Sequence, residues 1–224
     1  MDLILLFGAL LIVSISSLIL RGTYSKYKEV DIDSNYTGYE VAKKILKENG
    51  LDDIDVVRIS GELTDNYNNS KRRVSLSSDI YEGKSIAAVS VAAHECGHAI
   101  QYKEGYLPIK IRNILVPFVN IGNNIGYFVI MISIATSLTK LFMIGLILIS
   151  FALVFQLITL PCEFDASRRG KKLLVEYGII TEEELDGSKK VLLAAAFTYV
   201  AGLLSSIMQV LRLVLIFTGN RRND

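Results

Sequence analysis

The chain has 224 residues, which is enough for one domain with a sizeable core, and its formal net charge is +1. Such a balanced charge gives no reason to expect nucleic acid as a partner. Hydrophobic residues make up 51% of the chain and the mean hydropathy is +0.39, an excess that comes from uncharged apolar runs and is high for a water-soluble protein.

The first apolar run covers residues 2–20, about the length that a helix needs to cross a bilayer. No basic stretch precedes it and no small-residue cleavage site follows it, which indicates a retained anchor and not a removed signal peptide. Arg21, Lys26 and Lys28 come next, and basic residues beside a span favour the cytoplasmic side. We therefore expect a multi-pass protein of the cell membrane whose following segment lies in the cytoplasm.

Residues 24–112 form the polar part of the chain. Thr37-Gly38-Tyr39-Glu40 has the pattern of a capping box and predicts the start of a helix. Short strands are predicted over 54–59 and 73–77, as a β-hairpin whose connecting loop over 61–70 is rich in Asn, Asp and Gly.

The second of these strands contains Val74-Ser75-Leu76 and lies shortly before the only histidines of the chain. An exposed strand edge can hold an extended peptide through main-chain hydrogen bonds, so this strand is a candidate substrate-binding edge. A purely structural strand is an equal alternative. Tyr67, in the preceding loop, is a candidate to stabilise an oxyanion, although a surface tyrosine is the simpler reading.

The stretch 91–101 contains His-Glu-x-x-His. In a helix over residues 85–103, His94 and His98 lie on one face because positions i and i+4 do. Two imidazoles and a position left open to water suit a catalytic zinc ion. Glu95 can reach that water and accept its proton as a general base. A chance pattern is the alternative, but the small apolar flank and the lack of other histidines argue against it.

Two further apolar runs, over 114–138 and 141–160, are expected to cross the membrane. A tight turn at Thr139-Lys140 would join them into a hairpin that brings the chain back to the side it left. Residues 161–178 then form a separate helix after Pro161. A last helix, over 182–218, becomes apolar and supplies the fourth span.

A zinc site of the His₂Glu type needs one more carboxylate. Glu163 and Asp165 are the candidates, because the membrane hairpin returns the chain to the side of the histidines. A solvated charge at a helix N-terminus is the ordinary explanation for either residue. The two cysteines, Cys96 and Cys162, indicate no disulfide framework, and Cys96 is expected to be a small buried residue.

His-Glu-Cys-Gly-His-Ala-Ile-Gln at 94–101 and Glu-Phe-Asp-Ala-Ser-Arg-Arg at 163–169 resemble the YugP-like membrane zinc metallopeptidases of bacteria, over nearly the whole chain. More distantly, the layout is similar to the HtpX and Ste24 membrane proteases, which follow HExxH with a membrane hairpin and a Glu-x-x-Ala-Asp segment. This resemblance implies Glu163 as the third zinc ligand and Glu95 as the general base. The Asp of that segment corresponds to Ser167, a weaker orienting group for a ligating histidine.

Together these observations predict a mainly α integral membrane protein in a single domain over 1–224. It would have about four transmembrane helices and a small α+β, zincin-like catalytic domain at the cytoplasmic membrane face. The expected activity is zinc-dependent endopeptidase, with one Zn²⁺ per chain held by His94, His98 and Glu163 and with Glu95 as catalytic base. The expected partners are a peptide or membrane-protein substrate and the lipid bilayer.

Three alternatives stay open. The protein could be a catalytically silent zinc-binding scaffold or regulator in the membrane. It could be an intramembrane protease of the site-2 type, but its Asp186-Gly187 lies in a polar setting. It could be a transporter, for which a single charged residue in the last span, Arg212, is thin support.

Overall fold

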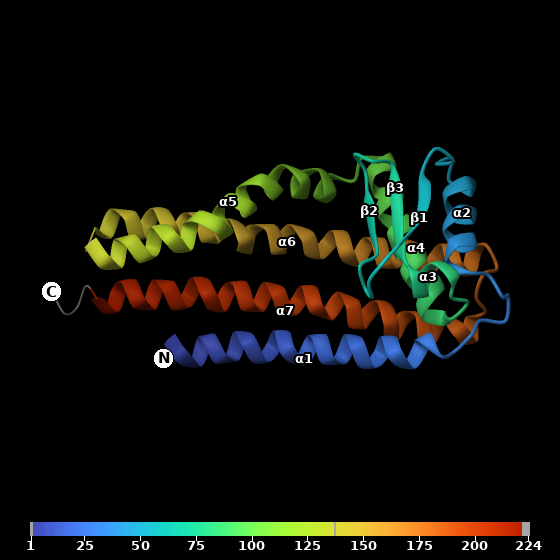
Figure 1. Ribbon diagram of the computed structural model, residues 1–224, viewed down its shortest axis with the longest axis horizontal. Coiled ribbons are helices and arrows are strands. Elements are labelled where there is room, and N and C mark those ends of the chain that lie inside the picture. The colour runs from blue at the N-terminus through green and yellow to red at the C-terminus, as the bar shows by residue number, and fades with distance from the viewer. Residues whose placement is uncertain (1, 137, 221–224) are drawn as a thin grey trace. The chain divides into compact units, whose positions relative to one another are not determined.

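The computed structural model describes residues 2–136 and 138–220 (Figure 1). Helices dominate this part of the chain, and three short strands form its single sheet. In chain order the elements are α1 (Asp2–Lys28), α2 (Gly38–Glu48), β1 (Asp55–Ile59), β2 (Asn66–Asn68), β3 (Arg73–Ser77), α3 (Ser78–Glu82), α4 (Ile86–Glu104), α5 (Leu107–Thr136), α6 (Thr139–Glu176) and α7 (Glu182–Asn220).

The contacts divide the chain into two compact units. The first, which we call the apolar unit, comprises Met1–Ser17, Leu107–Pro161 and Thr198–Asp224. The second, which we call the sheet unit, comprises Leu18–Tyr106 and Cys162–Phe197. The sheet unit contains both histidines and every strand, so it is the unit that can hold a metal site.

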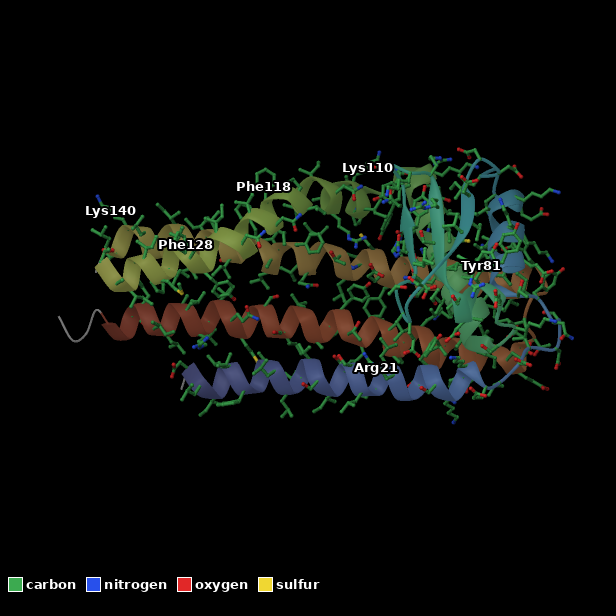
Figure 2. All side chains as sticks on the ribbon, viewed as in Figure 1. Arg21, Tyr81, Lys110, Phe118, Phe128 and Lys140 are labelled. Atoms are coloured by element: carbon green, nitrogen blue, oxygen red, sulfur yellow. The ribbon has the colours of Figure 1, made fainter. Side chains whose placement is uncertain are left out.

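Four helices of the described chain, α1, α5, α6 and α7, are long and apolar enough to cross a membrane. This confirms the four spans expected from the sequence. In the apolar unit, Ile130, Phe142, Ile149 and Leu213 form a small buried cluster. Other large apolar side chains point outward, as Phe128 on α5 does at 59% exposure (Figure 2). Exposed apolar surface on this scale is typical of an interaction surface, and on helices of bilayer length it suits a lipid environment.

The membrane hairpin differs from its prediction in where its helices begin and end. Pro161 was expected to close the third span, but it lies inside α6, which is one continuous helix. An interior proline costs about 3 kcal/mol, and here residues beyond it keep the helix because they are buried, among them Cys162, Glu163 and Ala166. The tight turn expected at residues 139–140 is likewise wrong, since α6 begins at Thr139.

The sheet has the strand order β1-β3-β2, with β1 parallel and β2 antiparallel to β3. The predicted hairpin of 54–59 with 73–77 is therefore wrong, because the antiparallel partner of β3 is β2, inside the stretch expected to be a loop. Asn66 and Asn68 are poor strand formers, and the strand rests instead on backbone pairing and on a turn in which Asn68 Oδ1 accepts from the Lys71 amide at 3.0 Å.

This order also overturns the proposed substrate edge. Val74 and Leu76 are fully buried in the central strand, which has β1 along one side and, as far as Ser75, β2 along the other. A peptide cannot add to a strand whose two edges are already paired. The sheet edges belong to β1 and β2.

Helix α2 packs against α4 and supplies much of the core of the sheet unit. The predicted capping box is confirmed, with reciprocal hydrogen bonds between Thr37 and Glu40. On the facing side of α4, Cys96 is fully buried beside the Ala42 carbonyl, as expected for a small core residue. The packing against α2 thus fixes one side of α4 in the core of the sheet unit.

Candidate metal centre

Local sequence sets the ends of α4, the helix that carries both histidines. At its start Ser85 Oγ accepts a hydrogen bond from the Ala88 amide at 3.2 Å, which satisfies one of the free N–H groups of the first turn. At its end Gly105 adopts the left-handed conformation with φ of 68°, which an L-residue with a Cβ rarely takes. Between these caps His94 and His98 lie one turn apart, with ring centroids separated by 4.8 Å.

Helix α6 meets α4 backbone to backbone, because small residues line the contact. A Cβ added at Gly97 would lie 2.6 Å from the Ala166 carbonyl oxygen. One added at Gly170 would lie 3.0 Å from the carbonyl oxygen of Ala93. This close approach lets a short side chain from α6 reach the histidine face of α4.

That side chain is Glu163, which is 1% exposed. Its Oε2 lies 3.2 Å from His94 Nε2 and 3.4 Å from His98 Nε2. The three potential ligand atoms all lie within 4.8 Å of one another. Tetrahedral zinc ligands at about 2.0–2.1 Å from the ion lie about 3.3 Å apart, so the two imidazoles and the carboxylate fit Zn²⁺.

The outer nitrogens of both imidazoles have defined partners. His94 Nδ1 is 3.0 Å from Ser167 Oγ, and His98 Nδ1 is 3.0 Å from Gln101 Oε1. Both Nε2 atoms are therefore left for Glu163 and a metal. Ser167, which was expected to be a weaker orienting group than an aspartate, contacts a candidate ligand through its hydroxyl.

Glu95 lies next to the ligand pair and is 7% exposed. Burial raises the pKa of its carboxyl group, and the neighbouring His94 and His98 partly oppose that shift. A carboxylate with a raised pKa is a stronger base, which suits a group that must take a proton from water.

Asp165, the alternative third ligand, points elsewhere. It accepts hydrogen bonds from Gln101 Nε2 at 2.9 Å and from Arg169 Nε at 2.6 Å, and it also pairs with Arg168. Tyr67, the candidate oxyanion stabiliser, lies in β2, and its hydroxyl donates to Asn69 Oδ1 at 3.0 Å.

The contact between Gln101 and His98 was missed by reasoning from the sequence, although an indication was present. Gln101 is three residues after His98, so it lies near the histidine face of a helix whose flank is small and apolar. A fully buried amide must find partners for its donors and its acceptor, and here it finds one in a candidate ligand.

Two histidines on one helix and a glutamate on a second, in a chain with four bilayer-length helices, are the combination expected of a membrane zinc metallopeptidase. The profile of the family described as "Putative neutral zinc metallopeptidase" matches residues 2–218, and the chain belongs to this family. Zinc is accordingly the metal that fits the cluster.

The chain is also similar to a curated protein of Bacillus subtilis (strain 168) named "Putative membrane protease YugP". The two are 43% identical over 202 residues, which cover 90% of each protein. No solved structure shows a significant match. The resemblance inferred from the two motifs is thereby confirmed at the level of the family.

Proposed function

We propose that this protein is a zinc-dependent endopeptidase of the cell membrane. The observation that carries the proposal is the convergence of His94 Nε2, His98 Nε2 and Glu163 Oε2 beside the buried carboxylate of Glu95. Three protein ligands with a fourth position left to water are the mark of a catalytic zinc site, whereas structural sites are closed by four protein ligands.

Zn²⁺, when bound, supplies a Lewis acid for the scissile carbonyl and lowers the pKa of a water molecule. Glu95 accepts the proton of the attacking water and returns it to the amine of the leaving peptide. Ser167 and Gln101 hold the outer nitrogens of the two imidazoles, so that both rings keep one orientation during the reaction.

The position of Glu163 along α6 indicates where the substrate is cut. The apolar stretch 141–160 of this helix is about 30 Å long, the thickness of a bilayer core, and Glu163 lies about 4.5 Å beyond its end. The metal ligands would then lie at the membrane surface, within reach of extramembrane loops and of the segments beside transmembrane helices. Asp186, which a site-2 protease would place in the membrane, instead forms an exposed ion pair with Lys190.

Strand β2 is the better candidate for a substrate-binding edge. It is an outer strand of the sheet, and the ring of Tyr67 contacts Tyr102 of α4 with centroids 5.6 Å apart. Tyr102 follows His98 by one helical turn. A peptide added to β2 would pass beside the face of α4 that bears the histidines, held by main-chain hydrogen bonds.

Glu95→Gln tests the proposed mechanism. We expect this variant to keep about one zinc per chain and to lose hydrolysis of unfolded protein or membrane peptides by about 100- to 10,000-fold, the contribution typical of a general base. Glu48→Gln, an exposed glutamate on α2, is the matched control and should stay fully active.

A Glu95→Gln variant with normal activity would refute the role of Glu95. A wild-type protein that binds zinc but cleaves none of these substrates would favour the silent scaffold instead.

A further inference from the structure

Gln101 is fully buried, and it is neither a proposed zinc ligand nor a group that transfers a proton in the proposed hydrolysis. We propose that Gln101 is a positioning residue that fixes His98 as a zinc ligand and ties α4 to α6, with Asp165 fixing Gln101 in turn. This inference rests on the proposed zinc site. It adds a residue that supports a zinc ligand without being a ligand itself.

The first step concerns the orientation of the Gln101 amide. Its nitrogen lies 2.8 Å from the Cys162 carbonyl oxygen and 2.9 Å from Asp165 Oδ2. Both of these groups only accept hydrogen bonds, so the NH₂ end of the amide must face them. The oxygen end then has to face His98, at 3.0 Å from Nδ1.

The second step concerns the tautomer of His98. An amide oxygen cannot donate, so His98 Nδ1 must carry the hydrogen that joins the two side chains. A neutral imidazole protonated on Nδ1 keeps its lone pair on Nε2, the atom that faces Glu163 at 3.4 Å. Gln101 therefore holds His98 in the only neutral form that can bind zinc through Nε2.

The third step explains why the Gln101 side-chain amide cannot rotate by 180° and exchange its oxygen and nitrogen. Asp165 is 7% exposed and its carboxylate is held by Arg169 and Arg168. Arg169 also donates to Glu104 Oε2 at 2.7 Å, and Glu104 lies on α4. The chain of contacts thus runs from α4 through α6 and back to α4, and it connects the helix of the two histidines to the helix of Glu163.

The hydrogen-bond partner of His94 does not fix the tautomer of that ring. Its partner is the hydroxyl of Ser167, which can donate or accept by rotating about its bond, so it does not choose a tautomer. Gln101 is therefore expected to matter more for zinc affinity than Ser167, and Ser167→Ala is the matched control.

The test is the affinity for Zn²⁺, measured at one fixed pH by competition with a chromophoric chelator on the full-length protein in detergent. Gln101→Leu should weaken zinc binding by about 10- to 100-fold, the cost typical of losing a residue that supports a metal ligand. Ser167→Ala should weaken it less. Gln101→Glu should also lower affinity, because it sets two carboxylates against each other.

The double variant Gln101→Glu/Asp165→Asn reverses the hydrogen bond between the two side chains and keeps an acceptor toward His98. It should bind zinc more tightly than Gln101→Glu alone, which a purely steric role would not produce.

Only two histidines are present, so selective ¹⁵N-histidine labelling gives a simple second readout. Before zinc is added, the wild type should show one ring with a hydrogen-bonded Nδ1–H group, the bond to Gln101 Oε1, and Gln101→Leu should lose this hydrogen bond. Wild-type zinc affinity and an unchanged Nδ1–H signal in Gln101→Leu would overturn the role of Gln101 and leave the peptidase proposal standing. A wild type that binds no zinc would overturn both.

Discussion

Glu163 and Asp165 are two positions apart on α6, and their surroundings give them different roles. Glu163 faces two imidazole nitrogens, which are candidate metal ligands. Asp165 faces two guanidinium groups and the NH₂ end of an amide, which only donate hydrogen bonds. The difference follows from the helix, because two positions turn a side chain by about 200°.

Glu163→Ala should therefore abolish or sharply weaken zinc binding, since it removes one of three ligands. We expect about one zinc per chain in the wild type, measured by elemental analysis, and a fraction of that in the variant. Glu176→Ala, at the end of the same helix, is the control and should leave the zinc content unchanged. Full zinc affinity without Glu163 would mean that another group completes the site.

At the scale of single residues, most of the candidate site could be predicted from the sequence. The spacing of His94 and His98 and the return of a membrane hairpin reduced the candidates for the third group to Glu163 and Asp165, and the family resemblance then selected Glu163, which the structure places in the cluster. The support that Gln101 gives to His98 could not be predicted from the sequence. Its partners Cys162 and Asp165 are more than 60 positions away, and only the packing of α4 against α6 reveals them.

Between elements, the decisive feature is the contact of α4 with α6. Gly97 lies between the two histidines in sequence, and its missing side chain makes room for the α6 backbone at Ala166. Gly170 does the same one turn further along α6, opposite Ala93. The ligand distances depend on how closely these two helices approach.

Gly97→Ala is expected to push α6 away from the histidines, because its Cβ would meet the Ala166 carbonyl oxygen at 2.6 Å. Overpacking of this kind costs about 1–3 kcal/mol. The variant should unfold at a lower temperature and bind zinc more weakly, as followed by thermal unfolding and chelator competition. Gly22→Ala on α1, where no atom lies within 4 Å of the added carbon, should change neither property. If Gly97→Ala behaves like Gly22→Ala, the helix contact does not set the site.

Element types were easier to anticipate than boundaries and pairing. The caps at Thr37 and Ser85 predicted where two helices start, since capping is a local interaction. The passage of α6 through Pro161 depends on buried contacts after it, and β2 depends on pairing with β3. Both are tertiary effects, which local preferences do not encode.

On the scale of the whole molecule, the even number of candidate spans predicts that the two ends of the chain lie on one side of the membrane. The basic residues after the first span favour the cytoplasm for the segment with the histidines, so both ends are expected outside. Alkaline phosphatase fused after Asp224 should be active, because it folds only outside the cytoplasm, and green fluorescent protein there should stay dark. Lys71→Cys, exposed in the sheet unit, should react with a thiol reagent only when the reagent crosses the membrane. The opposite pattern would reverse the orientation.

In the sequence, α5 and the first part of α6 lie between the two halves of the candidate site, which has a consequence for biosynthesis. His94 is synthesised 69 residues before Glu163. At about 5–20 residues per second, the histidine helix waits about 3–14 s for its proposed third ligand. During that interval the nascent chain holds at most two of the three proposed ligands, so the proposed zinc-dependent hydrolysis would begin only after Glu163 has been added.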